Sequence, residues 1–145
     1  MTASTGSPDA SLEKQPIEEI LRRAGLRPTR QRMALGGLLF GGMDRHVTAE
    51  QLHAEVVQLG EHVSLATVYN TLHQFTRAGL LRELAVEGSK TYFDTNTSNH
   101  SHYMFEQDGA LMDIPGGSIQ VMGLPEPPEG MRVAHIDVVV RLVKK

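Results

Sequence analysis

The sequence predicts an α+β protein in two parts: an N-terminal winged helix-turn-helix domain, followed by a small α/β dimerisation domain. Three observations lead to this prediction. Apolar residues first recur at the three- and four-residue spacing of helices, and near Leu81 they change to the alternation of strands. Two of the expected helices are joined by a short turn that contains Gly60, and an expected β-hairpin follows them. A last apolar run, 132–143, is long enough to form an edge strand in the second part.

Length and composition exclude several classes of protein. The chain has 145 residues, enough for one domain of ordinary size or two small ones, and 40% of them are hydrophobic. No apolar run reaches the roughly eighteen residues of a membrane helix, and the polar segment 1–15 lacks the apolar stretch of a signal peptide. We therefore expect a cytoplasmic protein in which residues 1–15 form a disordered tail. Cysteine is absent, which excludes disulfides, thiolate metal sites and a cysteine nucleophile.

The first domain is expected to span 16–94. Apolar spacing predicts four helices in it, at 16–24, 28–40, 48–59 and 64–78. Thr48 and Gln51 fit a capping box at the start of the third helix. Gly36 and Gly37 lie inside the second helix, where each costs about 1 kcal/mol relative to alanine, so we expect a neighbour to pack closely against them. Strands at 81–86 and 90–94 then form a hairpin around Glu87-Gly88-Ser89.

The second domain is expected to span 95–145 and to begin with a polar linker. Strands are predicted at 100–106 and 110–114, on either side of Asp108 and Gly109, a dipeptide typical of two-residue hairpin turns. The segment 115–131 is rich in glycine and proline and is expected to be irregular. The last strand is expected at 132–143, and its even positions from Ala134 to Leu142 are all apolar, which suits a dimer interface.

A basic cluster lies ahead of the expected recognition helix. It has five arginines and no acid: Arg22, Arg23, Arg27, Arg30 and Arg32. Alone, this cluster fits contact with a polyanion and a solvated helix face equally well. The fourth helix turns polar side chains away from its apolar face: Thr67, Asn70, Gln74 and Arg77, with Tyr69 beside them. These groups can contact base edges or phosphates, and together with the flanking helix, hairpin and arginines they indicate a DNA-reading helix rather than an ordinary amphipathic one.

The seven histidines are the obvious candidates for metal ligands in a chain without cysteine. His100 and His102 are separated by one residue, so on a strand both imidazoles lie on the same face. A two-residue turn after this strand would place Met104 opposite Asp113. Asp113 would then lie diagonal to His102 on that face, at about 7–8 Å between backbones, which a bound ion can bridge.

Two further ligands must come from elsewhere. Imidazole-and-carboxylate sites for iron, manganese or zinc take about four to six ligands. His46, in the loop expected before the third helix, and Asp94, at the end of the expected hairpin, are the candidates. A solvated histidine pair is the alternative interpretation of the pattern.

Three segments resemble the ferric uptake regulator (Fur) family, and the resemblance extends over about 18–144. They are Ala24–Arg32, Arg45–Glu50 and Ser64–Leu72. Three more resemble the iron response regulator (Irr) branch of that family: Tyr92–Thr97, Pro125–Gly130 and Asp137–Leu142. The resemblance implies a dimeric repressor of double-stranded operator DNA, with a winged-helix domain, an α/β dimerisation domain and a metal at the hinge between them.

The resemblance also implies roles for particular residues. The regulatory metal ligands of the family fall on His46, Asp94, His100, His102 and Asp113. Its recognition-helix contacts fall on Tyr69 and Asn70, and its minor-groove contact falls on Arg27. One divalent ion per chain is implied, iron or manganese in function and zinc as a candidate in purified protein. Haem is a further candidate ligand through the Irr branch, although the adjacent histidines of that branch read Asn99-His100-Ser101-His102 here.

The chain departs from the family at two other metal sites. Most members carry cysteine pairs for a structural zinc, and without cysteine we expect no such four-thiolate zinc site here. The second His/acid site of the family falls on Asn99, Ser101, Gln120 and His135. Three of these residues are poor ligands, so we expect no ion there.

Three functions compete. The first, which is our main prediction, is a DNA-binding regulator that controls iron and haem homeostasis genes in response to iron status; the other two are alternatives. The second is a peroxide-sensing repressor of the same fold, whose ligand set of three histidines and two aspartates this chain shows, and in which iron-catalysed oxidation of a ligand histidine releases DNA. The third is a small metal-dependent hydrolase, which needs an open coordination position and a general base. Only Glu87 or Glu106 would serve as that base, and no catalytic motif surrounds either, so we rank this function last and expect no enzyme.

Overall fold

The computed structural model describes residues 15–85, 90–115 and 117–145. It divides into two compact units. One holds the described residues up to Glu83 together with Thr91–Thr97, and the other holds those of Leu84–Lys90 and Ser98–Lys145. The tail expected at 1–15, apart from Gln15, and the turn expected at Glu87-Gly88-Ser89 lie outside the described residues. Among the described helices, none combines the length and the hydropathy that crossing a membrane requires.

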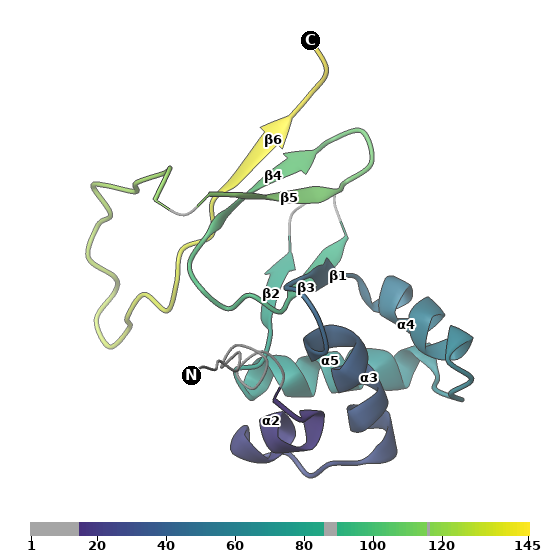
Figure 1. Cartoon of the computed structure of the whole chain (residues 1–145). Coiled ribbons are helices and arrows are strands. Elements are labelled where there is room, and N and C mark those ends of the chain that lie inside the picture. Colours follow the sequence, from purple (N-terminus) through teal and green to yellow (C-terminus); the bar gives the residue numbers. More distant parts are fainter. Residues whose placement is uncertain (1–14, 86–89, 116) are drawn as a thin grey trace, which may run out of the picture. The chain divides into compact units, whose positions relative to one another are not determined.

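The helices of the first unit lie where the apolar spacing predicts them. They are α2 (Ile17–Arg23), α3 (Arg30–Phe40), α4 (Ala49–Gln58) and α5 (Leu65–Arg77), drawn at the purple-to-teal end of the chain in Figure 1. The side chains of Thr29, Thr48 and Ser64 cap α3, α4 and α5 by accepting a hydrogen bond from the N–H three residues later. Thr48 and Gln51 form the expected capping box.

These helices enclose one hydrophobic core. Its fully buried side chains include Leu21, Leu35, Leu52, Leu72, Phe75 and Phe93. A Cβ added to Gly36 would lie 2.8 Å from Cγ2 of Ile17, so the close packing predicted for this glycine is present between α2 and α3. The same prediction is wrong for Gly37, because nothing lies within 4 Å of the corresponding position there.

The winged-helix sheet has a strand that periodicity did not predict. Strands β2 (Arg82–Ala85) and β3 (Thr91–Asp94) match the expected hairpin, and β1 (His46–Val47) joins them in the order β1-β3-β2. His46 pairs with Asp94 and Val47 pairs with Phe93. His46 therefore lies on a strand and not in a loop. Two residues are too few for alternation to be recognised, and burial of Val47 against Phe93 accounts for the pairing.

The second unit is built on another three-stranded sheet. Strands β4 (Ser101–Phe105), β5 (Leu111–Ile114) and β6 (Val139–Leu142) lie in the order β5-β4-β6, with β6 parallel to β4 (Figure 1). The final strand is shorter than the predicted 132–143, because β4 offers ladder partners only to residues 139–142. Ala134 and Ile136, expected on a buried face, are exposed as a result. The described residues of 115–131 form neither helix nor strand, as expected.

The turn between β4 and β5 is longer than predicted. The N–H of Gly109 donates to the carbonyl of Phe105 at 2.7 Å, and the carboxylate of Asp108 accepts from the N–H of Ala110 at 3.0 Å. Gly109 has a φ of 73°, a conformation that glycine adopts without strain. The loop therefore spans 106–109, and Met104 pairs with Leu111 rather than with Asp113. A register shift of two residues keeps every side chain on its predicted face.

Candidate metal centre

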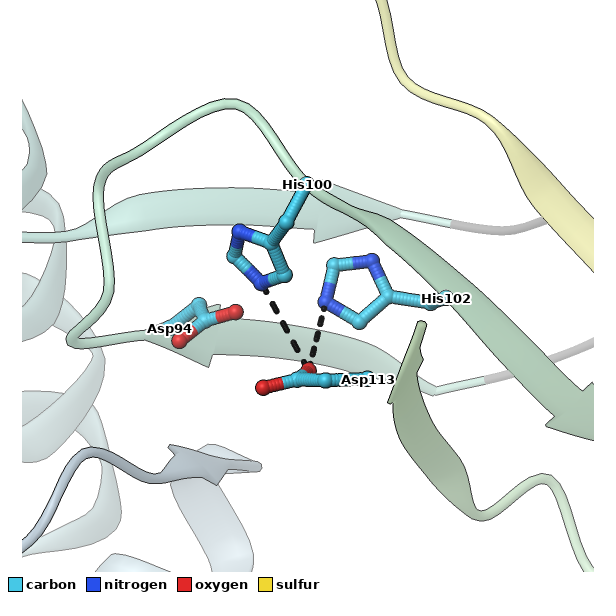
Figure 2. A group of neighbouring side chains, drawn as sticks. All are labelled: Asp94, His100, His102 and Asp113. Atoms are coloured by element: carbon cyan, nitrogen blue, oxygen red, sulfur yellow. Dashed lines mark ion pairs between the residues drawn. The ribbon is translucent and has the colours of Figure 1, made fainter. Parts of the chain in front are cut away.

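Strands β4 and β5, together with His100 directly before β4, bring three of the predicted ligands together; the strand begins at Ser101 and not at His100 as predicted. His102 lies directly opposite Asp113 in the ladder, and its Nε2 is 3.3 Å from Oδ1 of that aspartate. Nε2 of His100 lies 3.5 Å from the same oxygen, and the two imidazole centroids are 4.5 Å apart. Figure 2 shows both rings turned toward Asp113. The diagonal placement predicted for Asp113 is thus wrong, while the shared face is correct.

The histidines are held in defined orientations. Both side chains are 7% exposed, whereas that of Asp113 is 48% exposed, so solvent reaches the group from the carboxylate side. Nδ1 of His100 lies 2.9 Å from the carbonyl oxygen of Ser98. A carbonyl can only accept, so Nδ1 carries the proton, and in the neutral ring the lone pair is on the Nε2 that faces Asp113.

The donor atoms of this group suit a divalent ion. One ring nitrogen of each histidine and one carboxylate oxygen of Asp113 lie within 4.8 Å of one another. Imidazole nitrogen with carboxylate oxygen is the donor set of iron, manganese and zinc sites, and no thiol is present to favour a softer metal. The residues present therefore fit the kind of ion that the sequence predicts.

The other two predicted ligands belong to the first unit. His46 on β1 is paired directly with Asp94 on β3. Asp94, which is also labelled in Figure 2, is buried, and its carboxylate accepts a hydrogen bond from the N–H of Asn96 at 2.9 Å. The ring of His46 makes an edge contact with Tyr92 at a centroid distance of 5.9 Å. The first unit therefore holds one histidine and one aspartate paired on adjacent strands of its sheet.

Three of the four positions of the family's second site lie around a cavity in the second unit. Asn99, Ser101 and His135 are among the residues that line this space of about 370 Å³, and Gln120 is not. Nε2 of His135 is 3.3 Å from a carboxylate oxygen of Asp137. Apolar side chains such as Ile119 make up much of the remaining wall.

Helix α5 presents the residues predicted to contact DNA. Asn70 and Arg77 are exposed, and Thr67 is half-buried with its hydroxyl accepting from Ser64 at 3.0 Å. The hydroxyl of Tyr69 donates to a carboxylate oxygen of Glu50 at 2.9 Å, and this hydrogen bond raises the pKa of Tyr69 above its usual range.

The arginine cluster is not uniform. Arg22, Arg23 and Arg30 form ion pairs with acids that flank the cluster in sequence or space: Glu18, Glu19 and Glu61. Those three fit the solvated-face interpretation. Arg27 is exposed in the loop between α2 and α3. Arg32 instead reaches Gln74 on α5, a contact across 42 positions that no local pattern predicts.

Comparison with known proteins identifies relatives over most of the chain. The model of the ferric uptake regulator family matches residues 23–140. The chain is 35% identical over 114 residues to the peroxide-responsive repressor PerR of Staphylococcus epidermidis, covering 79% of this chain and 74% of that protein. It is 37% identical over 106 residues to PerR of Staphylococcus aureus, and the match covers 72% of this chain and 71% of that protein.

Solved structures of the same family share the fold. The ferric uptake regulator of Pseudomonas aeruginosa, solved with manganese, has a TM-score of 0.68 and 25% identity over 90% of this chain and 99% of that one. The ferric uptake regulator of Vibrio cholerae has a TM-score of 0.68 and 23% identity, and the match covers 88% of this chain and 98% of that one. At this identity the likeness shows the fold alone. The narrower resemblance to the Irr branch stays a prediction. The chain belongs to the ferric uptake regulator family and is a metal-dependent regulator of that family.

Proposed function

We propose that this protein is a repressor that binds operator DNA as a homodimer with a divalent metal bound, and that releases DNA when peroxide oxidises a ligand histidine. The observation that carries the proposal is the group formed by His100, His102 and Asp113, which offers only nitrogen and oxygen donors. Relatives that are 35% and 37% identical and carry the name peroxide-responsive repressor favour peroxide as the signal.

The proposed ion is shared between the two units. His100, His102 and Asp113 would provide ligands from the second unit, and His46 and Asp94, paired on β1 and β3, would provide them from the first. Iron or manganese is the proposed ion in function, and the general affinity order favours zinc in a purified sample. Bound Fe(II) would supply the redox chemistry that breaks the O–O bond of peroxide, so that one oxygen atom is added to a ligand imidazole and the other leaves as water.

An ion that joins both units would set the separation of the two recognition helices in a dimer. That separation must match half-sites about one helical turn apart on DNA. Loss of a ligand would release the constraint, so that a local chemical change would alter DNA affinity. The hinge location of the ion is therefore the part of the proposal that connects sensing with DNA binding.

Helix α5 is the proposed recognition helix. Thr67, Tyr69, Asn70 and Arg77 would contact operator DNA, and Arg27 would enter the minor groove; the exposure of Asn70, Arg77 and Arg27 supports this. Arg27→Ala should weaken binding to operator and random DNA alike and flatten the salt dependence. Tyr69→Ala should reduce binding to operator more than to random DNA, and an equal loss on both would contradict its role in sequence reading.

The second unit carries the proposed dimer interface. Apolar side chains are exposed along its irregular segment, including Ile119, Val121, Leu124, Val133 and Ile136. Such a concentration is typical of an association surface. We expect a dimer in analytical ultracentrifugation at micromolar concentration, and a monomer there would contradict the proposal.

A second candidate signal is iron status itself. The fold shared with the manganese-bound ferric uptake regulator of Pseudomonas aeruginosa at 25% identity supports this candidate. In this case iron would act only by occupying the site, and no ligand would be modified. Haem would be an alternative ligand under the same function, in keeping with the Irr resemblance.

Peptide-level mass spectrometry separates the two signals. After loading with Fe(II) and exposure to peroxide, peptides with His46, His100 or His102 should gain the mass of one oxygen atom as DNA binding is lost. Assignment to single residues is required, because the seven methionines also take up oxygen. Mn(II)-loaded protein and the His135 peptide are the controls. If DNA binding instead follows iron concentration and the histidines stay unmodified, iron status is the signal.

A further inference from the structure

Arg32 connects two parts of the first unit that are separate in sequence. It lies in the first turn of α3, and its Nε and Nη2 donate to Oε1 of Gln74 on α5 at 3.3 and 3.0 Å. Its Nη1 donates to the backbone carbonyl of Arg27 at 2.9 Å. One guanidinium thus holds the helix proposed to read DNA and the loop that carries the proposed minor-groove arginine.

The loop before α3 is fixed at consecutive residues. The carbonyl of Arg27 accepts from Arg32, and the side chain of Thr29 accepts from the N–H of Arg32 at 3.2 Å. Pro28 between them has a restricted φ. The backbone that carries the Arg27 side chain is therefore ordered before any DNA is bound.

The link has a physical consequence for DNA binding. Minor and major grooves are separated by a distance that B-form geometry fixes, so a protein that contacts both gains affinity when its two contacting elements are held at that separation. Gln74 is the contact on α5, since its side-chain carbonyl oxygen accepts hydrogen bonds from two N–H groups of Arg32. A lysine at position 32 would keep the charge but would lack the planar fork that reaches both acceptors.

We propose that Arg32 is a positioning residue, which holds the Arg27 loop against α5 so that the two DNA-contacting elements act as one rigid surface. This inference rests on the DNA-binding role proposed above for Arg27 and α5. Arg32 acts through the Arg27 carbonyl and Gln74 and not through a phosphate. Three of its five N–H donors are engaged within the protein.

The first test needs no DNA. Hydrogen–deuterium exchange of the peptide that contains Gly25–Thr29 should become faster in Arg32→Lys. Arg30→Lys is the matched control, because Arg30 lies in the same turn of α3, is exposed, and in the described contacts pairs with Glu61 and not with Gln74 or the Arg27 loop. Gln74→Leu removes the other end of the link without changing α3 and should also speed exchange. Unchanged exchange in both Arg32→Lys and Gln74→Leu would overturn the link.

The second test measures binding of the Mn(II)-loaded full chain to a duplex that the wild-type protein selects from random sequences. Arg32→Lys should weaken binding roughly tenfold, the scale of one or two charge-assisted hydrogen bonds, and should leave the salt slope unchanged. In a protein that already carries Arg27→Ala, Arg32→Lys should reduce DNA affinity little further. If Arg32→Lys reduces DNA affinity equally in the wild-type protein and in Arg27→Ala, or if it lowers the salt slope, Arg32 contacts DNA directly and the proposal is overturned. If the wild-type protein selects no duplex, the proposed function fails, and the exchange result still decides the link.

Discussion

His102 and Asp113 face each other directly across the β4–β5 ladder, with 3.3 Å between Nε2 and Oδ1. The backbone hydrogen bonds of two adjacent strands fix this pair, so it does not depend on the conformation of an exposed loop. A ligand pair held by a sheet is ordered before an ion arrives, which lowers the entropic cost of binding.

Removal of His102 should therefore disrupt metal binding specifically. His102→Ala should weaken Mn(II) binding by at least about tenfold, because the substitution removes a buried, oriented imidazole. His135→Ala is the matched control, since the His135 ring pairs with Asp137 and His135 is not among the proposed metal ligands. Isothermal titration calorimetry measures both affinities. Equal affinity in His102→Ala, or a requirement for His135, would mean that the ion binds elsewhere.

The two adjacent glycines of α3 should respond differently to alanine. Gly37→Ala should stabilise the protein by about 0.5–1 kcal/mol, because alanine favours the helix and nothing lies within 4 Å of the new methyl position. Gly36→Ala should lose this gain or reverse it, since its methyl would lie 2.8 Å from Ile17 Cγ2. Urea unfolding midpoints at constant slope give the comparison. Equal stabilisation by both substitutions would show that Ile17 can move aside at no cost.

Arg45 and Glu55 form a two-bond ion pair that should contribute to stability. Nη1 and Nη2 of Arg45 lie 2.9 and 2.6 Å from the two carboxylate oxygens, and Nη1 also donates to the carbonyl of Leu38 at 3.2 Å. Both side chains are about one-third exposed, so Glu55→Gln should cost about 1 kcal/mol of unfolding free energy. The control is Glu19→Gln, which breaks the more exposed pair with Arg23 and should cost less than about 0.5 kcal/mol. A similar loss of unfolding free energy in Glu55→Gln and Glu19→Gln would contradict the prediction that the less exposed pair contributes more.

The hydrogen bond between Tyr69 and Glu50 should be visible in an alkaline titration. It raises the pKa of Tyr69 above the usual value of about 10. Since the folded-state pKa lies above the unfolded one, the stabilisation is fully present below about pH 10 and is lost as pH rises through the folded-state pKa. Glu50→Gln should shift the phenolate absorption of this residue to lower pH, and Tyr69→Phe should remove it. An unchanged titration in Glu50→Gln would show that Tyr69 has no such partner in solution.

The sequence predicts helices better than strand pairing, for a physical reason that particular residues illustrate. The capping box of Thr48 and Gln51 is a contact three residues apart, so it can be recognised from the sequence and is present in the structure. The β4–β5 turn depended on which hydrogen bonds Asp108 and Gly109 would form, and both a two-residue and a longer loop are compatible with that dipeptide.

Contacts between distant residues were beyond local patterns. Strand β1 has two residues and exists through its pairing with β3, so periodicity could not predict it. The length of β6 depends on how many partners β4 can offer, and the contact of Arg32 with Gln74 requires the packing of α3 against α5. By contrast, the shared face of His102 and Asp113 follows from strand alternation and survives the error in register, and His100, directly before β4, lies near the same aspartate.

Strand β1 is short, and its position in the chain has a mechanical consequence. His46 stands two residues before Thr48, the cap at which α4 begins, and the extended backbone between them has little slack. A shift of His46 on binding an ion would therefore act close to the first turn of α4, from which the carboxylate of Glu50 accepts a hydrogen bond from the hydroxyl of Tyr69 on α5. A short stretch of backbone thus connects His46, a proposed metal ligand, with Glu50, which contacts the proposed recognition helix.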